Sequence, residues 1–208
     1  MKGTNQVVPR LAAMILMILC LEGCATIPDL NVYYRMPRET NHLQDKAVFL
    51  SIKDARKTKE ILGSGANKDY KNFSGKLSLS VARHGEEGFR IGLFPVPELL
   101  KEGFKRRLKQ LGLDTLEKAS GDLPGLELAL EDFSLDLVER KWVARIGLEA
   151  RILVRGKIMA RQKINGQAER TKIVGRREAD RAVGEIFTDA VNRVDVVRLF
   201  KQAKLLAE

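Results

Sequence analysis

The sequence predicts an α/β fold of the α+β type, a two-layer sandwich whose helices cover one face of a mixed, mostly antiparallel sheet. Two observations predict it. Apolar and polar residues alternate in several short segments between residues 47 and 174, the period of half-buried strands. Near 98–111 and 177–206 the apolar residues instead recur every three or four positions, as in amphipathic helices.

The first strand is predicted at residues 47–52, where Val48, Leu50 and Ile52 share one face. A polar, glycine-containing stretch at 61–65 follows it. A β-hairpin is then predicted, with a turn at 84–88 between two alternating runs of apolar residues (Leu77, Leu79, Val81 and Phe89, Ile91, Leu93). We treat this hairpin, within 65–95, as a possible insertion and leave the strand order of the sheet open.

A helix is predicted at residues 98–111 because its apolar residues form one stripe (Leu100, Phe104, Leu108, Leu111). Gly112 stands where a C-terminal cap belongs, and Leu113 follows as its hydrophobic contact. The cations in the second half of the helix suit the negative end of the helix dipole (Lys105, Arg106, Arg107, Lys109).

Residues 126–174 are rich in predicted strands. The alternation changes phase at Glu131–Asp132, which indicates a β-bulge or a strand that changes its buried face. Two sites compete for the later turn. Asn165–Gly166 is the stronger hairpin dipeptide. A three-residue loop at 155–157, with Gly156 as the turn, instead pairs Val154 with Ile158 and Leu148 with Ile164. We prefer that loop because it keeps the buried face apolar.

The preferred turn gathers six cations on the other face of these strands, relieved by Glu149 (Arg145, Arg151, Arg155, Lys157, Arg161, Lys163). One interpretation is a docking surface for an anionic partner. The other is a solvated sheet face whose charges keep it soluble and discourage edge pairing.

A long helical pattern begins near Arg177 and continues to about residue 206. Its apolar residues form one broad stripe (Ala182, Val183, Ile186, Phe187, Ala190, Val191, Val194). Asp195 interrupts the stripe and is expected to cap a second helical segment from 197 to 206.

The N-terminus has the pattern of an export signal. Lys2 and Arg10 precede the apolar run 11–19, which is shorter than the roughly 20 residues of a membrane-spanning helix but typical of a signal peptide. Leu21, Gly23 and Cys24 then resemble the lipobox of bacterial lipoproteins, although Glu22 departs from its usual pattern. The resemblance implies that residues 1–23 are removed and that Cys24 is lipid-modified. The alternatives are an ordinary cleaved signal and an uncleaved anchor.

A lipidated Cys24 would fasten the mature chain to a membrane. Residues 24–45 contain Pro28 and Pro37 and are expected to form a flexible tether, followed by a single domain at 46–208. By resemblance to known sorting signals, Ala25 favours the outer membrane, facing the periplasm, and the inner membrane stays open. Behind an export signal, the net charge of +10 indicates an anionic lipid or an envelope protein complex as partner, rather than nucleic acid.

No catalytic or metal-binding motif stands out, so we expect no enzyme, metal or cofactor. His42 and His84 lie apart from any nucleophile pattern. Asp54 and Arg56 are best interpreted as a local salt bridge at a strand end. Two functions remain: a non-catalytic adaptor or assembly factor of the cell envelope, or an auxiliary protein that binds a lipid or glycolipid in an apolar pocket.

Several patterns together resemble the YajG-like family of uncharacterised bacterial lipoproteins, which is related to auxiliary lipoproteins of lipid-handling transporters. They are Cys24, the strand and turn at 48–56, the stretch 61–63, the helix ending at 111–113 and the run 190–192. The stretch 65–95 fits least well. The resemblance implies a small α/β sandwich and leaves the activity open.

Overall fold

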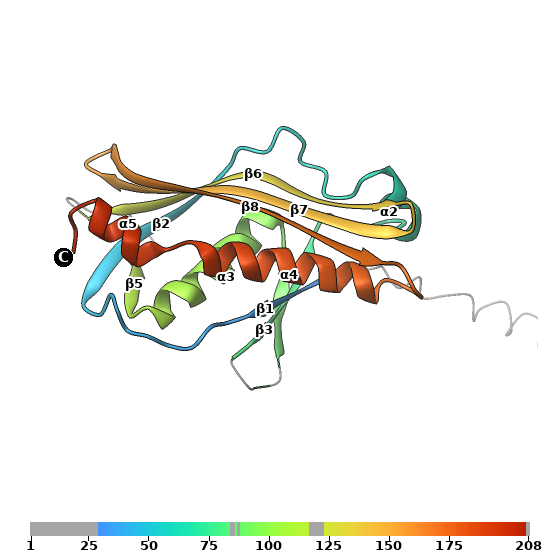
Figure 1. The fold of residues 1–208 in the computed structure, drawn as a ribbon, viewed down its shortest axis with the longest axis horizontal. Helices are drawn as coiled ribbons and strands as arrows, with labels where there is room; N and C mark the ends of the chain where they lie inside the picture. Colours follow the sequence, from blue (N-terminus) through green and yellow to red (C-terminus); the bar gives the residue numbers. More distant parts are fainter. Residues whose placement is uncertain (1–28, 84–85, 87, 117–122, 207–208) are drawn as a thin grey trace, which may run out of the picture.

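Two open sheets and four helices make up the part of the chain that the computed structural model describes, residues 29–83, 86, 88–116 and 123–206. The α+β class predicted from the sequence is confirmed. The strands divide between a five-stranded sheet and a three-stranded sheet, and Figure 1 shows helix α4 running between the two.

The five-stranded sheet has the order β5-β2-β6-β7-β8. β2 (Lys46–Asp54) lies parallel to β5 (Leu113–Leu116) and to β6 (Gly125–Val138). β7 (Lys141–Val154) and β8 (Lys157–Thr171) continue the sheet in antiparallel fashion. The phase change predicted at Glu131 is a bulge in β6, after which every second residue again points into the core.

The turn between β7 and β8 is at Gly156, as predicted, but its loop has two residues, not three. Arg155 and Gly156 have φ values of 49° and 76°, which suit the tight turns that join two strands. Val154 therefore pairs with Lys157 instead of Ile158. An irregularity in the register beside Leu153 restores the alternation, and Leu148 pairs with Ile164 as expected. Asn165 and Gly166 lie within β8 and form no turn.

The three-stranded sheet has the order β1-β3-β4 and contains the predicted hairpin. β3 (Leu77–Ala82) and β4 (Phe89–Phe94) are antiparallel, with a register shift after Leu79. β4 is an edge strand, so Phe89 stays 58% exposed and Leu93 45% exposed, although both belong to the predicted apolar alternation.

β1 (Leu30–Arg35) corrects the expectation of a tether over residues 24–45. It runs parallel to β3, and Leu30, Val32 and Tyr34 are fully buried. Its alternation covers only three apolar residues between Pro28 and Pro37, too few to stand out from a linker. The folded domain therefore begins about 16 residues earlier than predicted, at Leu30, six residues after Cys24.

Both predicted helical regions are helical. α3 spans Val96–Gln110. Gly112 follows its C-terminal cap, and the φ of +77° is the left-handed conformation typical of a glycine at this position. The C-terminal pattern forms α4 (Arg177–Arg193) and α5 (Val196–Gln202). Asp195 caps α5 as predicted, since its carboxylate accepts the backbone N–H of Arg198 at 2.9 Å.

The apolar stripe of α4 is buried against both sheets. Phe187 is fully buried and meets the ring of Tyr34 edge-on, with the centroids 5.8 Å apart. This contact joins α4 to the three-stranded sheet. On the five-stranded sheet, the inward-facing residues of β6 and β7 are buried in the same continuous core.

A second stripe of α4, which is polar, lies along the free edge of β1. Asp180 accepts the backbone N–H of Asn31 at 2.9 Å, Thr188 donates to the carbonyl of Tyr33 at 3.0 Å, and Asn192 donates to the carbonyl of Arg35 at 3.1 Å. Gly184 completes the four-residue spacing, because a Cβ there would lie 3.1 Å from the backbone nitrogen of Tyr33. Side chains of α4 thus occupy positions where a further strand would bind β1.

Among the described residues, no helix has both the length and the apolar character needed to cross a membrane.

Candidate functional site

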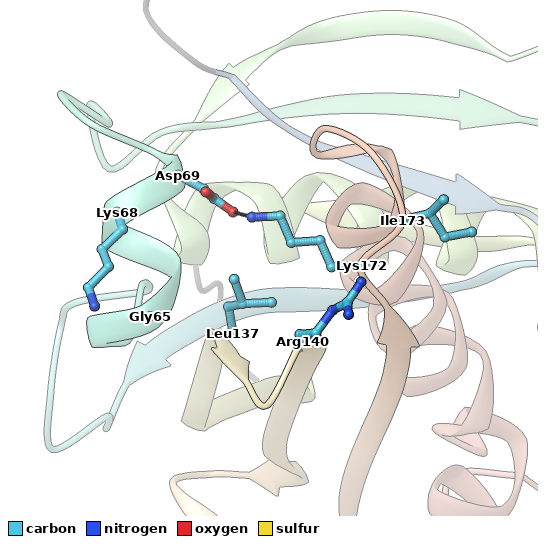
Figure 2. A pocket seen from close by; sticks show the side chains of 7 residues that line it. All are labelled: Gly65, Lys68, Asp69, Leu137, Arg140, Lys172 and Ile173. Carbon is cyan, nitrogen blue, oxygen red and sulfur yellow. Dashed lines mark hydrogen bonds and ion pairs between the residues drawn. The ribbon is translucent and has the colours of Figure 1, made fainter.

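A pocket of about 500 Å³ lies at the end of the molecule where the described chain begins (Figure 2). It is formed by three segments: the short helix α2 (Ser64–Asp69), the turn between β6 and β7, and the end of β8. Three cations line it together with one carboxylate (Lys68, Arg140, Lys172 and Asp69). Figure 2 shows Lys172 and Asp69 pointing toward each other, where they form an ion pair.

Helix α2 is held in place by a side chain from β6. Asp136 Oδ1 accepts the backbone N–H groups of Gly65 at 2.9 Å and Ala66 at 3.1 Å. These are the N–H groups that a helix leaves without partners at its N-terminus. The capping residue is about 70 positions away in the sequence, so local patterns did not predict α2.

Aromatic rings and cations together hold the wall of the pocket opposite α2. Tyr70 meets Trp142 edge-on at 5.9 Å, and the guanidinium of Arg176 lies 5.1 Å from the centre of the Tyr70 ring. The ammonium of Lys172 lies 5.6 Å from the centre of the Trp142 ring. Tyr70 and Trp142 are almost completely buried, and burial raises the pKa of the Tyr70 hydroxyl. The loop 172–176 is therefore fixed to the core at both of its ends.

Between these fixed ends, Ile173 and Val174 are 77% and 83% exposed, the highest values among the large apolar residues described as exposed. Figure 2 shows Ile173 pointing away from the Asp69–Lys172 ion pair. Val138, the last residue of β6 before the adjoining turn, is 48% exposed. Apolar side chains thus project from an end of the molecule that also carries a basic pocket.

The chemistry of this pocket favours a small anionic group. Lys68 and Arg140 have no ion-pair partner among the described residues, whereas Asp69 balances Lys172. The lining therefore keeps an excess of two positive charges. Arg176 and Arg177 follow directly in the sequence and are exposed. The run 172–177, an apolar pair and a glycine between cations, is the signal in the sequence that our prediction did not use.

The basic face predicted on the five-stranded sheet is interleaved with carboxylates. Arg151 forms ion pairs with Glu127, at 3.0 Å, and with Glu149. Lys163 binds Glu131 at 2.6 Å. The sequence prediction considered β7 and β8 and left out β6, which contributes Glu127 and Glu131 to the same neighbourhood.

The four other predicted cations of this face differ in their surroundings. Arg145 donates to the side-chain oxygen of Gln167 at 3.1 Å. Arg155 and Lys157 are exposed at the β7–β8 turn, and Arg161 is exposed opposite Arg151. The anionic-partner role of the six residues stays a prediction.

Asp54 and Arg56 form the local salt bridge that the sequence predicts. The guanidinium of Arg56 donates to both carboxylate oxygens of Asp54, at 2.9 and 3.0 Å. The hydrogen bonds from Arg56 hold the pKa of Asp54 well below its usual range. Both residues line a surface groove of about 900 Å³, which lies between residues 54–62, the segment 67–75 and the start of α3.

Asp54→Asn is expected to lower the free energy of unfolding by about 1 kcal/mol at neutral pH. Because the pKa of Asp54 is lower in the folded than in the unfolded protein, the ion pair contributes fully above the unfolded value of 3.8. Its contribution disappears as the pH falls toward the folded pKa. Urea unfolding of both proteins at decreasing pH should show their difference shrinking below pH 3.8.

Asp114→Asn, at an exposed position of β5, is the matched control and should change the stability by less than about 0.5 kcal/mol. A difference between Asp54→Asn and the parent that persists undiminished in acid would contradict the assignment.

Cys24 and His84, singled out in the sequence, lie outside the described residues. His42 is exposed in the segment that precedes β2. Across residues 29–83, 86, 88–116 and 123–206, no three side chains of His, Cys, Asp or Glu come together as metal ligands would.

No protein-family model matches the sequence, and no curated protein matches it. Among solved structures, a Xanthomonas campestris protein of the DUF330 family is 12% identical, with a TM-score of 0.53. The match covers 86% of this chain and 100% of that one, and it shows a shared fold. Rare lipoprotein B from Shewanella oneidensis is 22% identical over 51% of this chain and 89% of that one, with a TM-score of 0.37. The YajG-like resemblance is not confirmed by these matches.

Proposed function

We propose that this protein is a lipoprotein of the bacterial cell envelope, anchored through Cys24, that acts as a non-catalytic adaptor or auxiliary component. The observation that carries the proposal is the short link between the lipobox cysteine and the fold. Asp29, only five residues after Cys24, already forms an ion pair with Arg90 of β4, at 2.9 Å. Five residues span about 18 Å at most. A lipid on Cys24 would therefore hold one end of the domain beside the membrane.

The packing supports an adaptor in preference to a carrier that encloses its ligand. The large apolar side chains between the helices and the five-stranded sheet are fully buried and belong to one continuous core (Phe104, Leu108, Leu148, Phe187, Leu199). A partner would therefore meet the outside of the molecule. By its sorting residue Ala25, the proposed location is the outer membrane, with the domain in the periplasm.

The 900 Å³ groove supports the second candidate, binding of a lipid or glycolipid. Its walls are mainly apolar or aromatic (Ile61, Leu62, Tyr70, Phe73, Pro95, Val96), and Lys59 and Lys71 belong to its lining. The volume falls within the range of small-molecule sites. Lys59 already forms an ion pair with Asp54 at 3.0 Å, so Lys71 is the cation of the lining that suits an acidic headgroup. The groove lies at the surface, so a ligand there would stay partly open to solvent.

The test is the intact mass of the full-length protein purified from membranes, beside the variants Cys24→Ala and Cys20→Ala. We expect the parent and Cys20→Ala to have the mass of residues 24–208 plus acyl chains and to stay with the membrane. Cys24→Ala should lose both the acyl chains and the membrane retention. The Cys20 variant is the matched control because that residue leaves with the signal peptide.

An unmodified parent, or one cleaved elsewhere, would refute the anchor. A native mass of the same preparation addresses the second candidate. A bound lipid that denaturation releases would favour the lipid-binding function, and a native mass without added lipid would favour the adaptor.

A further inference from the structure

We infer that the loop 172–176 and the basic pocket beside it form a lipid-docking surface that binds the anionic phospholipid headgroups of the membrane carrying the anchor. The inference rests on the proposed function, because the anchor decides which end of the domain meets the membrane. The surface comprises Ile173 and Val174 together with Lys68, Arg140 and Lys172.

The docking surface lies at the end of the domain where the described chain begins. Asn31, at the start of β1, binds Asp180 in the first turn of α4, and α4 follows the loop 172–176 directly. Asp29 is near enough to Asp180 to contribute to the raised pKa of that carboxylate, which is due mainly to burial. The point where the chain enters the domain therefore lies at the same end as the docking surface. A link of about 18 Å at most from Cys24 brings this end to the lipid.

Ile173 and Val174 are adjacent, strongly exposed, and carried on a loop fixed by the contacts of Lys172 and Arg176 to Trp142 and Tyr70. Apolar side chains beside cations are the pattern of segments that bury themselves at the boundary between headgroups and acyl chains. Insertion of this pair would require no rearrangement of the core.

The pocket keeps an excess of two positive charges, and Arg176 and Arg177 add two more beside it. Cations at a membrane surface are attracted to anionic lipids, and the attraction falls off within a few ångströms to a nanometre in salt. The pocket volume of about 500 Å³ is large enough for a phosphate-containing headgroup.

The opposite end of the molecule offers a matched control. Ile158 and Met159 are adjacent in β8, 53% and 47% exposed, and lie next to the cation Lys157. This second apolar pair lies 12 and 13 residues before the end of β8 at Thr171, a distance of about 40 Å along the strand. The two ends are alike in composition, but only the first lies where the described chain enters the domain.

The experiment uses residues 29–208, which contain every described element and the continuous core, so the result does not depend on lipidation. The chain is sedimented with vesicles of phosphatidylcholine alone or mixed with phosphatidylglycerol. We expect binding to the mixed vesicles that added salt weakens. Ile173→Asp/Val174→Asp should weaken this binding about tenfold or more, and Lys68→Gln/Arg140→Gln should reduce the preference for phosphatidylglycerol.

Ile158→Asp/Met159→Asp makes the same change from apolar to acidic residues at the other end, and Arg198→Gln/Lys201→Gln removes two exposed cations of α5. Both control variants should leave binding unchanged. Circular dichroism verifies that each variant is folded. Equal binding to both kinds of vesicle, no binding, or a loss caused by the control variants would overturn the docking surface. Failure here with an acylated Cys24 would leave the anchor intact, whereas an unmodified Cys24 would refute the anchor alone.

Discussion

Phe187→Ala is expected to lower the free energy of unfolding by about 3–5 kcal/mol, the range for removing a large buried aromatic ring. Phe187 is fully buried on α4, and its ring contacts Tyr34 of the three-stranded sheet edge-on at 5.8 Å. The substitution would leave a cavity where α4 joins the two sheets. Urea unfolding of residues 29–208, followed by circular dichroism, measures the effect. The melting temperature should fall by about 2–4 °C for each kcal/mol.

Val174→Ala is the control for this substitution, because Val174 is 83% exposed. It should change the free energy of unfolding by less than about 0.5 kcal/mol. If Phe187→Ala were as mild as Val174→Ala, then α4 would not be packed between the sheets as described.

Gly184→Val is expected to destabilise the fold by about 1–3 kcal/mol or more through overpacking. A Cβ at this position would lie 3.1 Å from the nitrogen and 3.2 Å from the oxygen of Tyr33. The valine would push α4 away from β1 and stretch the hydrogen bonds of Thr188 and Asn192 to that strand. Intrinsic helix propensity has the opposite sign, since it favours valine over glycine by a few tenths of a kcal/mol. Denaturant unfolding decides between the two effects, because overpacking lowers the free energy of unfolding and the helix propensity of valine raises it.

Glu185→Val places the same side chain at the next position, which is exposed. It removes an ion pair with Arg170 at the surface, so we expect a loss of at most about 1 kcal/mol. A Gly184→Val variant as stable as the parent would show that α4 does not lie against the backbone of β1.

The parts of the fold that the sequence predicted depend on local pattern. α3 and its glycine cap, the bulge at Glu131, the turn at Gly156 and the cap at Asp195 each arise from residues close together in the chain. The turn shows how far such reasoning extends. Alternation predicts the correct site for the turn, at Gly156, but the length of the loop depends on an irregularity in β8 that has no signature in the sequence.

The parts that the sequence did not predict depend on contacts between distant segments. The sequence pattern predicts a tether in place of β1, because the three buried residues of this strand gain their partners only from β3 and α4. The polar stripe of α4 was hidden by the stronger apolar stripe on the same helix. In the predicted basic face, Arg151 and Lys163 form ion pairs with carboxylates of β6, which the patterns of β7 and β8 alone do not reveal.

The candidate site also depends on distant contacts, since its walls come from α2, the β6–β7 turn and the end of β8. Sequence could have indicated only one part of it, the exposed apolar pair within a basic run at 172–177. Which cations surround that pair is decided by the tertiary fold, through the cap that Asp136 provides to α2.

The position of α4 in the sequence has a consequence for the order in which the protein can be assembled. One helix covers the edge of β1, and the segment after it binds β8 through Gln162, which contacts Asp195 and Arg193. β1 is synthesised before α4, so it presents an unpaired edge until the helix follows. Such edges invite pairing with other chains. The chain without α4 is therefore more prone to aggregation during its biogenesis than the complete chain, because the arrival of α4 covers the edge of β1.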